Sequence, residues 1–203
     1  MTDTSKKPRM PKGQGKDRLI KHSKMLFLEN GYESTSPQDI YKSSGVGQGS
    51  FYHHFSSKAD LMKTVLDEIC ETESHSLHRI LKKDSSAKDK LNEFLDQPRK
   101  GKNGCKFGRF IYESSVVNSD IAIPIRNYFQ YLEESLDYLI GECQKSCSVT
   151  QCLSSKQISQ TIIAQIQGGY ILSRVKESDI FLTNSITSIK KLIFNDEIVN
   201  DRD

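Results

Sequence analysis

Polar residues with the chemistry to contact a nucleic acid are concentrated near position 50 of the chain. Gln48 and Ser50 can hydrogen-bond to base edges, since glutamine pairs bidentately with adenine and serine is a permissive contact. The same stretch carries donors suited to phosphate oxygens, namely Tyr52, His53 and Lys58. Phe51 and Phe55 alternate with these residues at a spacing that turns both rings to the inner side of a short helix. The pattern therefore predicts a helix whose polar side faces DNA.

Two short helices and a tight turn are expected to position these side chains. Ser36 can cap a helix whose first residue is Pro37, where a missing N–H costs nothing. That helix is expected to run to Ser43, and Gly45 can take the left-handed conformation of a tight turn. A second helix is expected over residues 48–54. Two short helices around a glycine turn are typical of the helix-turn-helix motif, whose second helix enters the major groove.

The stretch from Arg18 to Leu66 resembles the signature of the TetR (tetracycline-repressor-like) family of transcriptional regulators. The residues that carry the resemblance are an aromatic after Gly31, then Thr35, Ile40, Gly45, Val46, Gly49, Tyr52, Phe55 and Lys58, in that order. The resemblance implies an all-α fold. It implies an N-terminal three-helix helix-turn-helix domain that binds DNA, and a C-terminal helical bundle for regulation and dimerisation.

The resemblance also implies a role for each residue of the motif. Phosphates would be held by Thr35, Tyr52, His53 and Lys58, and Gln38 would lie near the DNA backbone. Gln48 and Ser50 would sit in the groove, and Gly49 lets the backbone approach closely. Gly47 departs from the family, which often has serine as the helix cap, at a cost of a few tenths of a kcal/mol. The predicted DNA-binding set is Thr35, Gln38, Gly47, Gln48, Gly49, Ser50, Tyr52, His53 and Lys58.

Charge is distributed unevenly along the 203 residues. Residues 1–58 contain ten Lys and Arg against five Asp and Glu, a net charge of +5, whereas the whole chain carries +3. A positive N-terminal third on a nearly neutral body is expected of a protein that binds a polyanion at one end.

Composition and the motif predict that the chain divides into three segments. Residues 1–15 have almost no large apolar side chains, so we expect a basic arm that is disordered in the free protein. The arm could also order on DNA through its basic residues, which are Lys6, Lys7, Arg9 and Lys12. Residues 16–60 are expected to form the helix-turn-helix domain. Residues 61–203 are expected to form an effector-binding and dimerisation domain.

Helical periodicity continues through the rest of the chain. Helices are expected over 16–30, 58–81, 87–97, 105–117, 120–140, 156–176 and 180–194, with an exposed basic loop at 99–104. Gly168 and Gly169 lie in mid-helix, where glycine is unfavourable, so a close helix crossing is expected there. By the resemblance, the helices within 156–194 pair with their copies in a homodimer, which matches two-fold DNA sites.

Polar residues within the apolar helices of the body could line a pocket, because most pockets are apolar with a few placed polar groups. The candidates are Arg109, Tyr112, Glu113, Tyr128, Tyr131 and Arg174. The segment 104–113 also resembles the start of the regulatory domain in one TetR subgroup. The resemblance implies a small-molecule effector but does not identify it.

Five cysteines leave at least one thiol unpaired, and we expect reduced thiols with no metal or cofactor. One alternative is a thiol- or metal-responsive regulator, because Cys143, Cys147 and Cys152 lie close in sequence and could bind a soft metal or form a disulfide. His75 and His78 share a helix face and would need a third ligand to hold a metal.

The remaining patterns argue against a membrane protein and against an enzyme. No apolar run reaches 18 residues, and the basic N-terminus lacks the apolar segment of a secretory signal. The chain has no phosphate-binding glycine loop, GxSxG or HExxH motif. A helical enzyme with a degenerate DNA-binding motif stays open, because a Cys–His pair can meet in space. We expect a cytoplasmic, ligand-released repressor that binds a palindromic operator as a homodimer.

Overall fold

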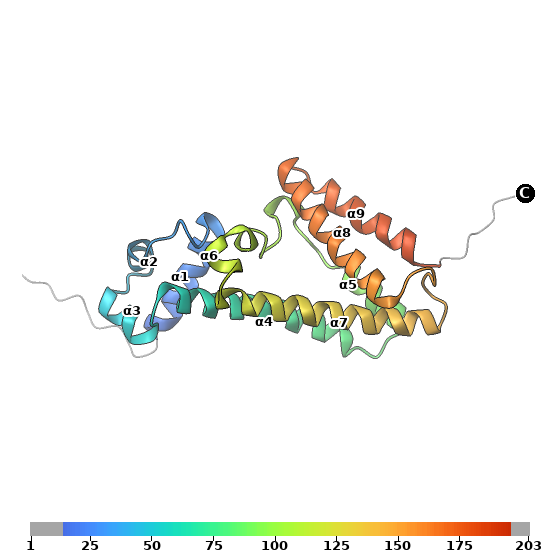
Figure 1. Ribbon diagram of the computed structural model, residues 1–203, viewed down its shortest axis with the longest axis horizontal. Helices are drawn as coiled ribbons and strands as arrows, with labels where there is room; N and C mark the ends of the chain where they lie inside the picture. The colour runs from blue at the N-terminus through green and yellow to red at the C-terminus, as the bar shows by residue number, and fades with distance from the viewer. Residues whose placement is uncertain (1–13, 196–203) are drawn as a thin grey trace, which may run out of the picture. The chain divides into compact units, whose positions relative to one another are not determined.

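The computed structural model describes residues 14–195, which are mostly helical (Figure 1). The α-helices in this range are α1 Gln14–Asn30, α2 Pro37–Ser44, α3 Gln48–His54, α4 Lys58–Leu81, α5 Ala87–Asp96, α6 Ser114–Val117, α7 Ile123–Lys145, α8 Ser155–Val175 and α9 Ile180–Ile193. No strand forms within these residues, although Val149 and Phe194 make an isolated antiparallel bridge. The all-α prediction is therefore confirmed. The predicted basic arm lies, except for its last two residues, outside the described range.

Between residues 14 and 195, no helix is both long enough and apolar enough to span a lipid bilayer. The chain divides into two compact units, each assembled from two stretches of sequence. The first unit contains the residues up to Ile69 together with Arg109–Pro124, and the second contains Cys70–Gly108 and the residues from Ile125 onward.

The first unit packs around a small core supplied by α1, α2, α3 and the first half of α4. Its most deeply buried apolar side chains, all less than 2% exposed, include Leu19, Phe27, Ile40, Phe51, Leu61 and Met62. Helix α1 begins at Gln14 instead of the expected Lys16. Gly15 is buried, and a Cβ there would lie 3.3 Å from His54 Nε2 and 3.5 Å from Ser50 Oγ. The absence of a side chain thus lets the start of α1 approach α3.

The second unit packs the rest of α4 with α5, α7, α8 and α9. Its core includes Leu91, Leu136, Ile140, Val149, Ile158 and Ile162. Helices α8 and α9 lie side by side and antiparallel (Figure 1), as expected for helices joined by a short connection. The connection is held by Ser173, whose Oγ accepts a hydrogen bond of 2.9 Å from the Leu182 backbone N–H.

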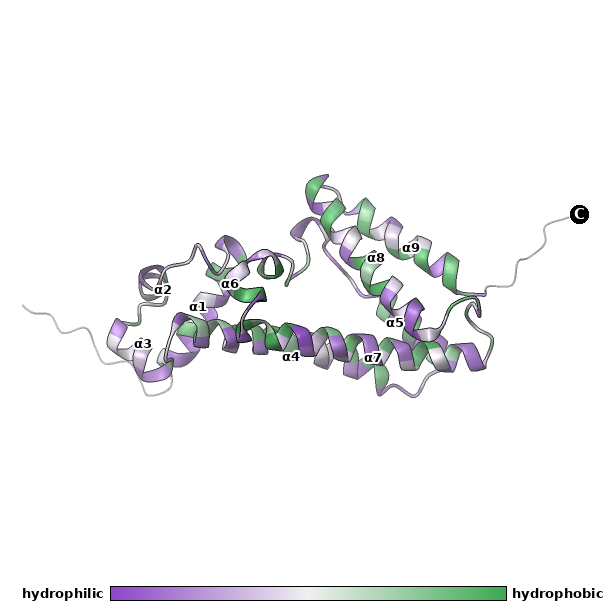
Figure 2. Ribbon diagram, in the orientation of Figure 1, coloured by the Kyte–Doolittle hydropathy of each residue, from purple (hydrophilic) through white to green (hydrophobic). Residues whose placement is uncertain are grey.

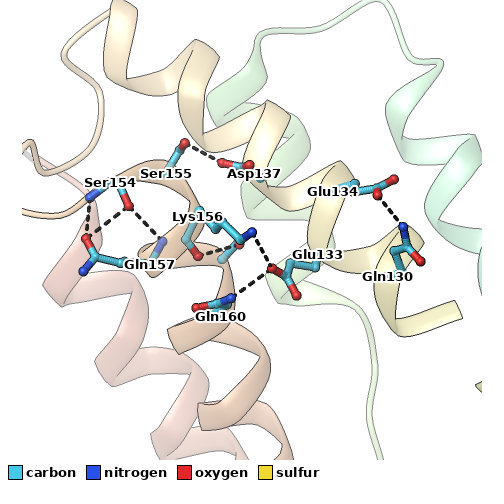
Figure 3. A network of polar contacts seen from close by, with 10 residues as sticks. Gln130, Glu133, Glu134, Asp137, Ser154, Ser155, Lys156, Gln157 and Gln160 are labelled. Carbon is cyan, nitrogen blue, oxygen red and sulfur yellow. Dashed lines mark hydrogen bonds and ion pairs between the residues drawn. The ribbon is translucent and has the colours of Figure 1, made fainter. Parts of the chain in front are cut away.

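Polar contacts fix the start of α8 (Figure 3). Ser154 and Gln157 form a reciprocal capping box at the N-terminus of the helix. Ser155 Oγ donates to the Asp137 carboxylate of α7, and Gln160 Nε2 donates to Glu133 Oε1 at 3.0 Å. The first turns of α8 are therefore tied to the middle of α7 by side chains as well as by the core.

The expected helix at 105–117 does not form, and that prediction is wrong. The segment makes a turn at Cys105–Gly108, a 3-10 helix at Phe110–Tyr112 and the single turn of α6. Gly104 has a φ of 75°, and the Gly108 N–H donates to the Cys105 carbonyl at 3.0 Å. Two glycines within five residues weaken a helix, and here they make turns instead.

Two neighbouring boundaries also differ from expectation. The helix expected to begin at Asp120 begins at Ile123, because Ser119 caps a 3-10 turn over Asp120–Ala122 that precedes it. The loop expected to be exposed at 99–104 is partly buried at Gly101. Its backbone is anchored by Asp179, whose Oδ1 accepts from the Lys102 N–H at 2.8 Å. The sequence alone does not predict this hydrogen bond, because the two residues are 77 positions apart.

The paired glycines of α8 have different environments. A Cβ on Gly169 would lie 2.9 Å from Leu182 Cδ1 and 3.0 Å from Leu182 Cα, whereas a Cβ on Gly168 would meet nothing within 4 Å. The expected close crossing is therefore with α9, and Gly169 alone makes it.

We predict that Gly169→Ala destabilises the protein and that Gly168→Ala does not. The methyl of Gly169→Ala would overlap the backbone of α9, and overpacking typically costs about 1–3 kcal/mol. Gly168→Ala adds no overlap and favours the helix by roughly 0.5–1 kcal/mol. Urea unfolding of both variants measures the difference. Equal stability of the two variants would contradict the crossing at Gly169.

Candidate functional site

Helix α2 is built as its sequence predicts. Ser36 Oγ accepts a hydrogen bond from the Asp39 N–H at 3.2 Å, and the Asp39 carboxylate accepts from the Ser36 N–H at 2.9 Å. Pro37 occupies the first helical position, and Gly45 ends the helix with a φ of 68°. The capping box and the glycine define both ends of an eight-residue helix.

Helix α3 follows after the turn and is held by its apolar side. Val46, Phe51 and Phe55 are 1%, 1% and 3% exposed. Gly47 caps the helix through its backbone conformation, with no side-chain hydrogen bond. The Val46 N–H is satisfied by Ser44 Oγ at 3.2 Å. The turn thus fixes where α3 starts, and the three apolar anchors fix its rotation about its own axis.

The opposite side of α3 is exposed. Its exposed residues are Gln48, Gly49, Ser50, Tyr52 and His53. A Cβ placed on Gly47 or Gly49 would meet no atom within 4 Å, so the face is open at these two positions, whereas Ser50 lies beside Gly15 at the start of α1. Tyr52 is 54% exposed. It also lies close to Tyr41 on α2, whose pKa is raised mainly by burial and then by Tyr52. Five of the nine predicted DNA-binding residues therefore share one open helix face, and Gly47 directly precedes it.

The other predicted contacts lie in different surroundings. Gln38 is exposed on α2. Thr35 is only 1% exposed, and its Oγ1 donates to the Gly31 carbonyl at 2.7 Å. Its side chain cannot reach a phosphate in this conformation, so that part of the prediction is corrected. The hydroxyl of a threonine before a helix cap can contact a phosphate or donate to the backbone, and the sequence alone does not distinguish the two.

Lys58 also has a structural role. Its Nζ donates to the carbonyls of Tyr32 and Thr35 at 2.9 and 3.0 Å, and it lies 4.2 Å from the centroid of the Tyr32 ring. Partial burial lowers the pKa of this ammonium group, while Glu113 and Glu33 counteract the shift. Lys58 therefore ties the start of α4 to the loop after α1.

Two glutamates join that loop to the segment around α6 within the first unit. Glu113 accepts from the Tyr32 N–H at 3.0 Å through Oε1 and from the Glu33 N–H at 2.6 Å through Oε2. Glu33 accepts in return from the Ser115 N–H at 3.1 Å and from its Oγ at 2.7 Å. We name Tyr32, Glu33, Glu113 and Ser115 the carboxylate clasp. It satisfies three backbone N–H groups with two carboxylates.

The predicted pocket residues are divided between the two units. Arg109, Tyr112 and Glu113 belong to the first unit, where Tyr112 is 75% exposed and Glu113 serves the clasp. Tyr128, Tyr131 and Arg174 belong to the second unit, and Arg174 is exposed. The prediction rested on polar residues within apolar helices, and the helix expected over 105–117, which would have carried Arg109, Tyr112 and Glu113, does not form.

One predicted pocket residue does line a cavity. Tyr128 contributes to a cavity of about 90 Å³ inside the second unit. Its other polar lining residues are Glu73, Gln97, Arg99, Cys105, Lys106, Gln167 and Tyr170, which the prediction missed. Arg99 was assigned to an exposed loop, yet its guanidinium caps α5 by donating to the Leu95 and Phe94 carbonyls at 2.8 and 2.7 Å. Pro98 directly after a helix end was the signal that could have suggested this cap.

The cysteines of the sensor alternative do not converge. Cys143 lies in the core, where burial raises its pKa to about 11, whereas Cys147 and Cys152 are exposed. Among residues 14–195, no group of three or more His, Cys, Asp or Glu side chains could hold a metal ion. The i, i+4 spacing of Cys143 and Cys147 fails to pair them because Cys147 leaves the helix with a φ of 54°.

Comparisons with known proteins bear on the same residues. Residues 19–65 match the family described as bacterial regulatory proteins, tetR family. The HTH-type transcriptional regulator in the lacX 3' region of Lactococcus lactis subsp. lactis is 28% identical over 171 residues, which cover 80% of this chain and 84% of that protein. The HTH-type transcriptional repressor DhaR of Mycobacterium sp. (strain GP1) is 26% identical over 181 residues, covering 81% and 87%.

Solved structures share the fold. A TetR transcriptional regulator from Chloroflexus aurantiacus J-10-FL is similar with a TM-score of 0.77 at 23% identity, over 91% of this chain and 99% of that one. The reduced form of E. coli NemR is similar with a TM-score of 0.76 at 19% identity, over 91% and 99%. The arrangement of helices described above is therefore one that these regulators also adopt.

We predict that the clasp makes the first unit sensitive to acid. Hydrogen bonds from the Ser115 side chain and backbone lower the pKa of Glu33, so the folded chain keeps Glu33 ionised below the unfolded value of about 4.3. Its contribution is present above that value and is lost as the pH falls through the lower, folded pKa.

Thermal unfolding between pH 6 and pH 3 tests this prediction on Glu33→Gln, with Glu29→Gln on the exposed side of α1 as the matched control. Glu33→Gln should lower the midpoint temperature of unfolding at pH 6. The difference in midpoint from the wild type should be smaller at pH 3. A gap that stays constant with pH would show that the charge of Glu33 contributes nothing to the clasp.

Proposed function

Since this chain belongs to the TetR family of bacterial regulatory proteins, we propose that it is a repressor that binds a palindromic operator as a homodimer and leaves it when a small molecule binds the second unit. As a DNA-binding transcriptional regulator it would act in the cytoplasm, where the DNA lies. The relatives it matches are named as transcriptional regulators and repressors.

The exposed face of α3 is the observation that carries this proposal. Its polar side chains project away from a helix anchored by Phe51, and its two flanking glycine positions are open. A helix of this kind can enter the major groove, where Gln48 pairs with adenine and Ser50 makes a permissive contact. Tyr52 and His53 would donate to phosphates at the groove edge, with Gln38 nearby on α2.

Basic side chains around the helix-turn-helix motif support an orientation in which α3 faces the DNA. Lys16, Arg18, Lys21 and Lys42 are exposed on α1 and α2. A Cβ on Gly45 would lie 3.0 Å from Arg18 Nη2, so this guanidinium lies beside the turn between α2 and α3. Long-range attraction of DNA therefore favours the same side of the first unit that presents α3.

We predict different losses from the two kinds of contact. Gln48→Ala should weaken binding to the preferred operator by about 1–3 kcal/mol and relax the preference at one base position, as expected for a bidentate base contact. Tyr52→Phe should weaken binding to all sequences about equally, because phosphate contacts carry no sequence information.

Fluorescence anisotropy on a DNA sequence selected from random duplexes, and on a scrambled duplex, measures both effects. Tyr138→Phe is the matched control, since Tyr138 is 66% exposed on α7 in the other unit. If Gln48→Ala lost affinity equally for selected and scrambled DNA, α3 would not read bases.

A homodimer is proposed through α8 and α9. Apolar segments alternate with polar ones along both helices (Figure 2), and several of their large apolar side chains are exposed: Ile171, Leu172, Val175, Ile180 and Leu192, at 49–73%. Exposed apolar groups on two adjacent helices favour association with another apolar surface. A second copy of the same helix pair would bury them in a closed two-fold interface.

We predict that Val175→Glu produces a monomer. Val175 is 70% exposed, so the substitution is tolerated in an isolated chain but places a carboxylate inside the proposed interface. Sedimentation equilibrium should show dimers for the wild type and for Lys176→Glu, which changes an adjacent exposed side chain. Dimers of unchanged stability in Val175→Glu would exclude this end of α8 from the interface.

Release by an effector would work through α4. Glu73 of α4 lines the cavity of the second unit, while the earlier turns of the same helix belong to the first unit. We propose that ligand binding in the cavity tilts α4 and changes the separation of the two α3 helices in the dimer, so that affinity for an operator of fixed spacing falls.

A further inference from the structure

The cavity of the second unit has walls that are chemically distinct. Phe107, Tyr128 and Phe129 form an aromatic cluster on one side, with ring centroids 5.2–5.8 Å apart. Tyr170 of α8 and the end of α5 with Arg99 complete the lining. The site therefore pairs flat apolar surface with a small number of polar groups, which is typical of a small-molecule site.

The lining of this cavity carries a net positive charge. The charged side chains that line the cavity are Glu73, Arg99 and Lys106. Lys106 forms an ion pair with Glu73, so their charges offset each other. Arg99 donates to three backbone carbonyls and lies 5.1 Å from the centroid of the Phe94 ring. Burial lowers the pKa of its guanidinium, and the charges of Asp96 and Glu73 partly oppose this shift. The lining thus carries two cations and one carboxylate, a surplus of one positive charge.

Arg99 has donors to spare. A guanidinium carries five N–H groups. Three hydrogen bonds go to the carbonyls of Leu95, Gln97 and Phe94, two from Nη1 and one from Nη2. Those bonds cap α5 and use three of the five N–H groups, which leaves two for a ligand. A carboxylate can accept from two N–H groups of one guanidinium at the same time.

The neighbouring hydroxyls and thiol carry no charge at neutral pH. Burial raises the pKa of Tyr128, Tyr170 and Cys105, so all three stay protonated at neutral pH. None of the three can supply the missing negative charge. A ligand that brings an anion into the cavity would therefore meet Glu73 as the one negative side chain of the lining, and Lys106 is paired with it.

Size restricts the ligand further. The cavity measures about 90 Å³. A cavity of about 150 Å³ accommodates benzene, so this one holds a molecule of roughly four to six non-hydrogen atoms.

We propose that the cavity binds a small monocarboxylate of the acetate-to-butyrate size class, with its carboxylate on Arg99 and its short carbon chain against Phe107 and Phe129. The identification of this acid as the compound that releases DNA rests on the function proposed above. Binding of the acid itself does not depend on that function.

Calorimetric titration of the full-length protein with acetate, propionate and butyrate, each compared with its neutral amide, tests the proposal. The acids should bind at least about tenfold more tightly than the amides, because a charge-assisted bidentate pair is lost in the amide. Arg99→Lys keeps the charge but loses the fork, and should weaken the acids without affecting the amides. Equal binding of acids and amides, or no binding of either, would overturn the proposal.

Tyr170→Phe provides a second test in case Arg99→Lys does not fold. It removes one hydroxyl from the cavity and should weaken the acids severalfold, whereas Tyr138→Phe, outside the cavity, should not. Anisotropy with selected DNA then separates the two proposals. Acids that bind the protein in calorimetry but leave DNA bound would support the site and contradict its role in release. DNA binding with no acid binding would overturn the site and leave the regulator intact.

Discussion

The presentation of α3 depends on the burial of three apolar side chains. A helix of seven residues is too short to be stable alone in water, so its orientation must come from tertiary contacts. Val46, Phe51 and Phe55 supply them from one side, and every exposed residue of the helix takes its direction from that anchoring. The polar face is thus a consequence of where the core lies. Specificity at a base edge requires such rigidity, because a hydrogen bond tolerates little angular error.

The second unit shows how a polar cavity can persist within an apolar bundle. Its cation is Arg99, whose hydrogen bonds to the end of α5 offset part of the cost of burying the charge. The ion pair of Glu73 and Lys106 closes another part of the lining. Arg99, Glu73 and Lys106 therefore each have a structural partner before any ligand arrives. Such preorganisation lowers the conformational entropy that the side chains of the site must lose when a ligand binds.

Local rules predicted the first unit well. The cap at Ser36, the turn at Gly45 and the extent of α3 depend on residues within a few positions of one another, and the structure confirms them. Thr35 and Lys58 were harder, because a hydroxyl or an ammonium group can serve either the backbone or a ligand. Only the coordinates show that the backbone accepts their hydrogen bonds.

Predictions for the second half failed where distant contacts decide. The segment after Gly104 has apolar residues at helical spacing, yet glycine turns and the clasp shape it instead. Arg99 has the composition of a solvated loop, and its burial follows from α5 ending where it does. Burial of a charged residue cannot be inferred from local sequence when its partners are carbonyls, since every residue has one.

The carboxylate clasp has a consequence for synthesis of the chain on the ribosome. Glu113 follows Tyr32 by 81 positions, so it is added roughly 4–16 s later at translation rates of 5–20 residues per second. Until then the N–H groups of Tyr32 and Glu33 have only water as a partner. The loop after α1 in a nascent chain thus lacks its carboxylate partner until the segment around α6 has left the exit tunnel. Prematurely terminated chains that lack Glu113 therefore leave the clasp of the first unit incomplete.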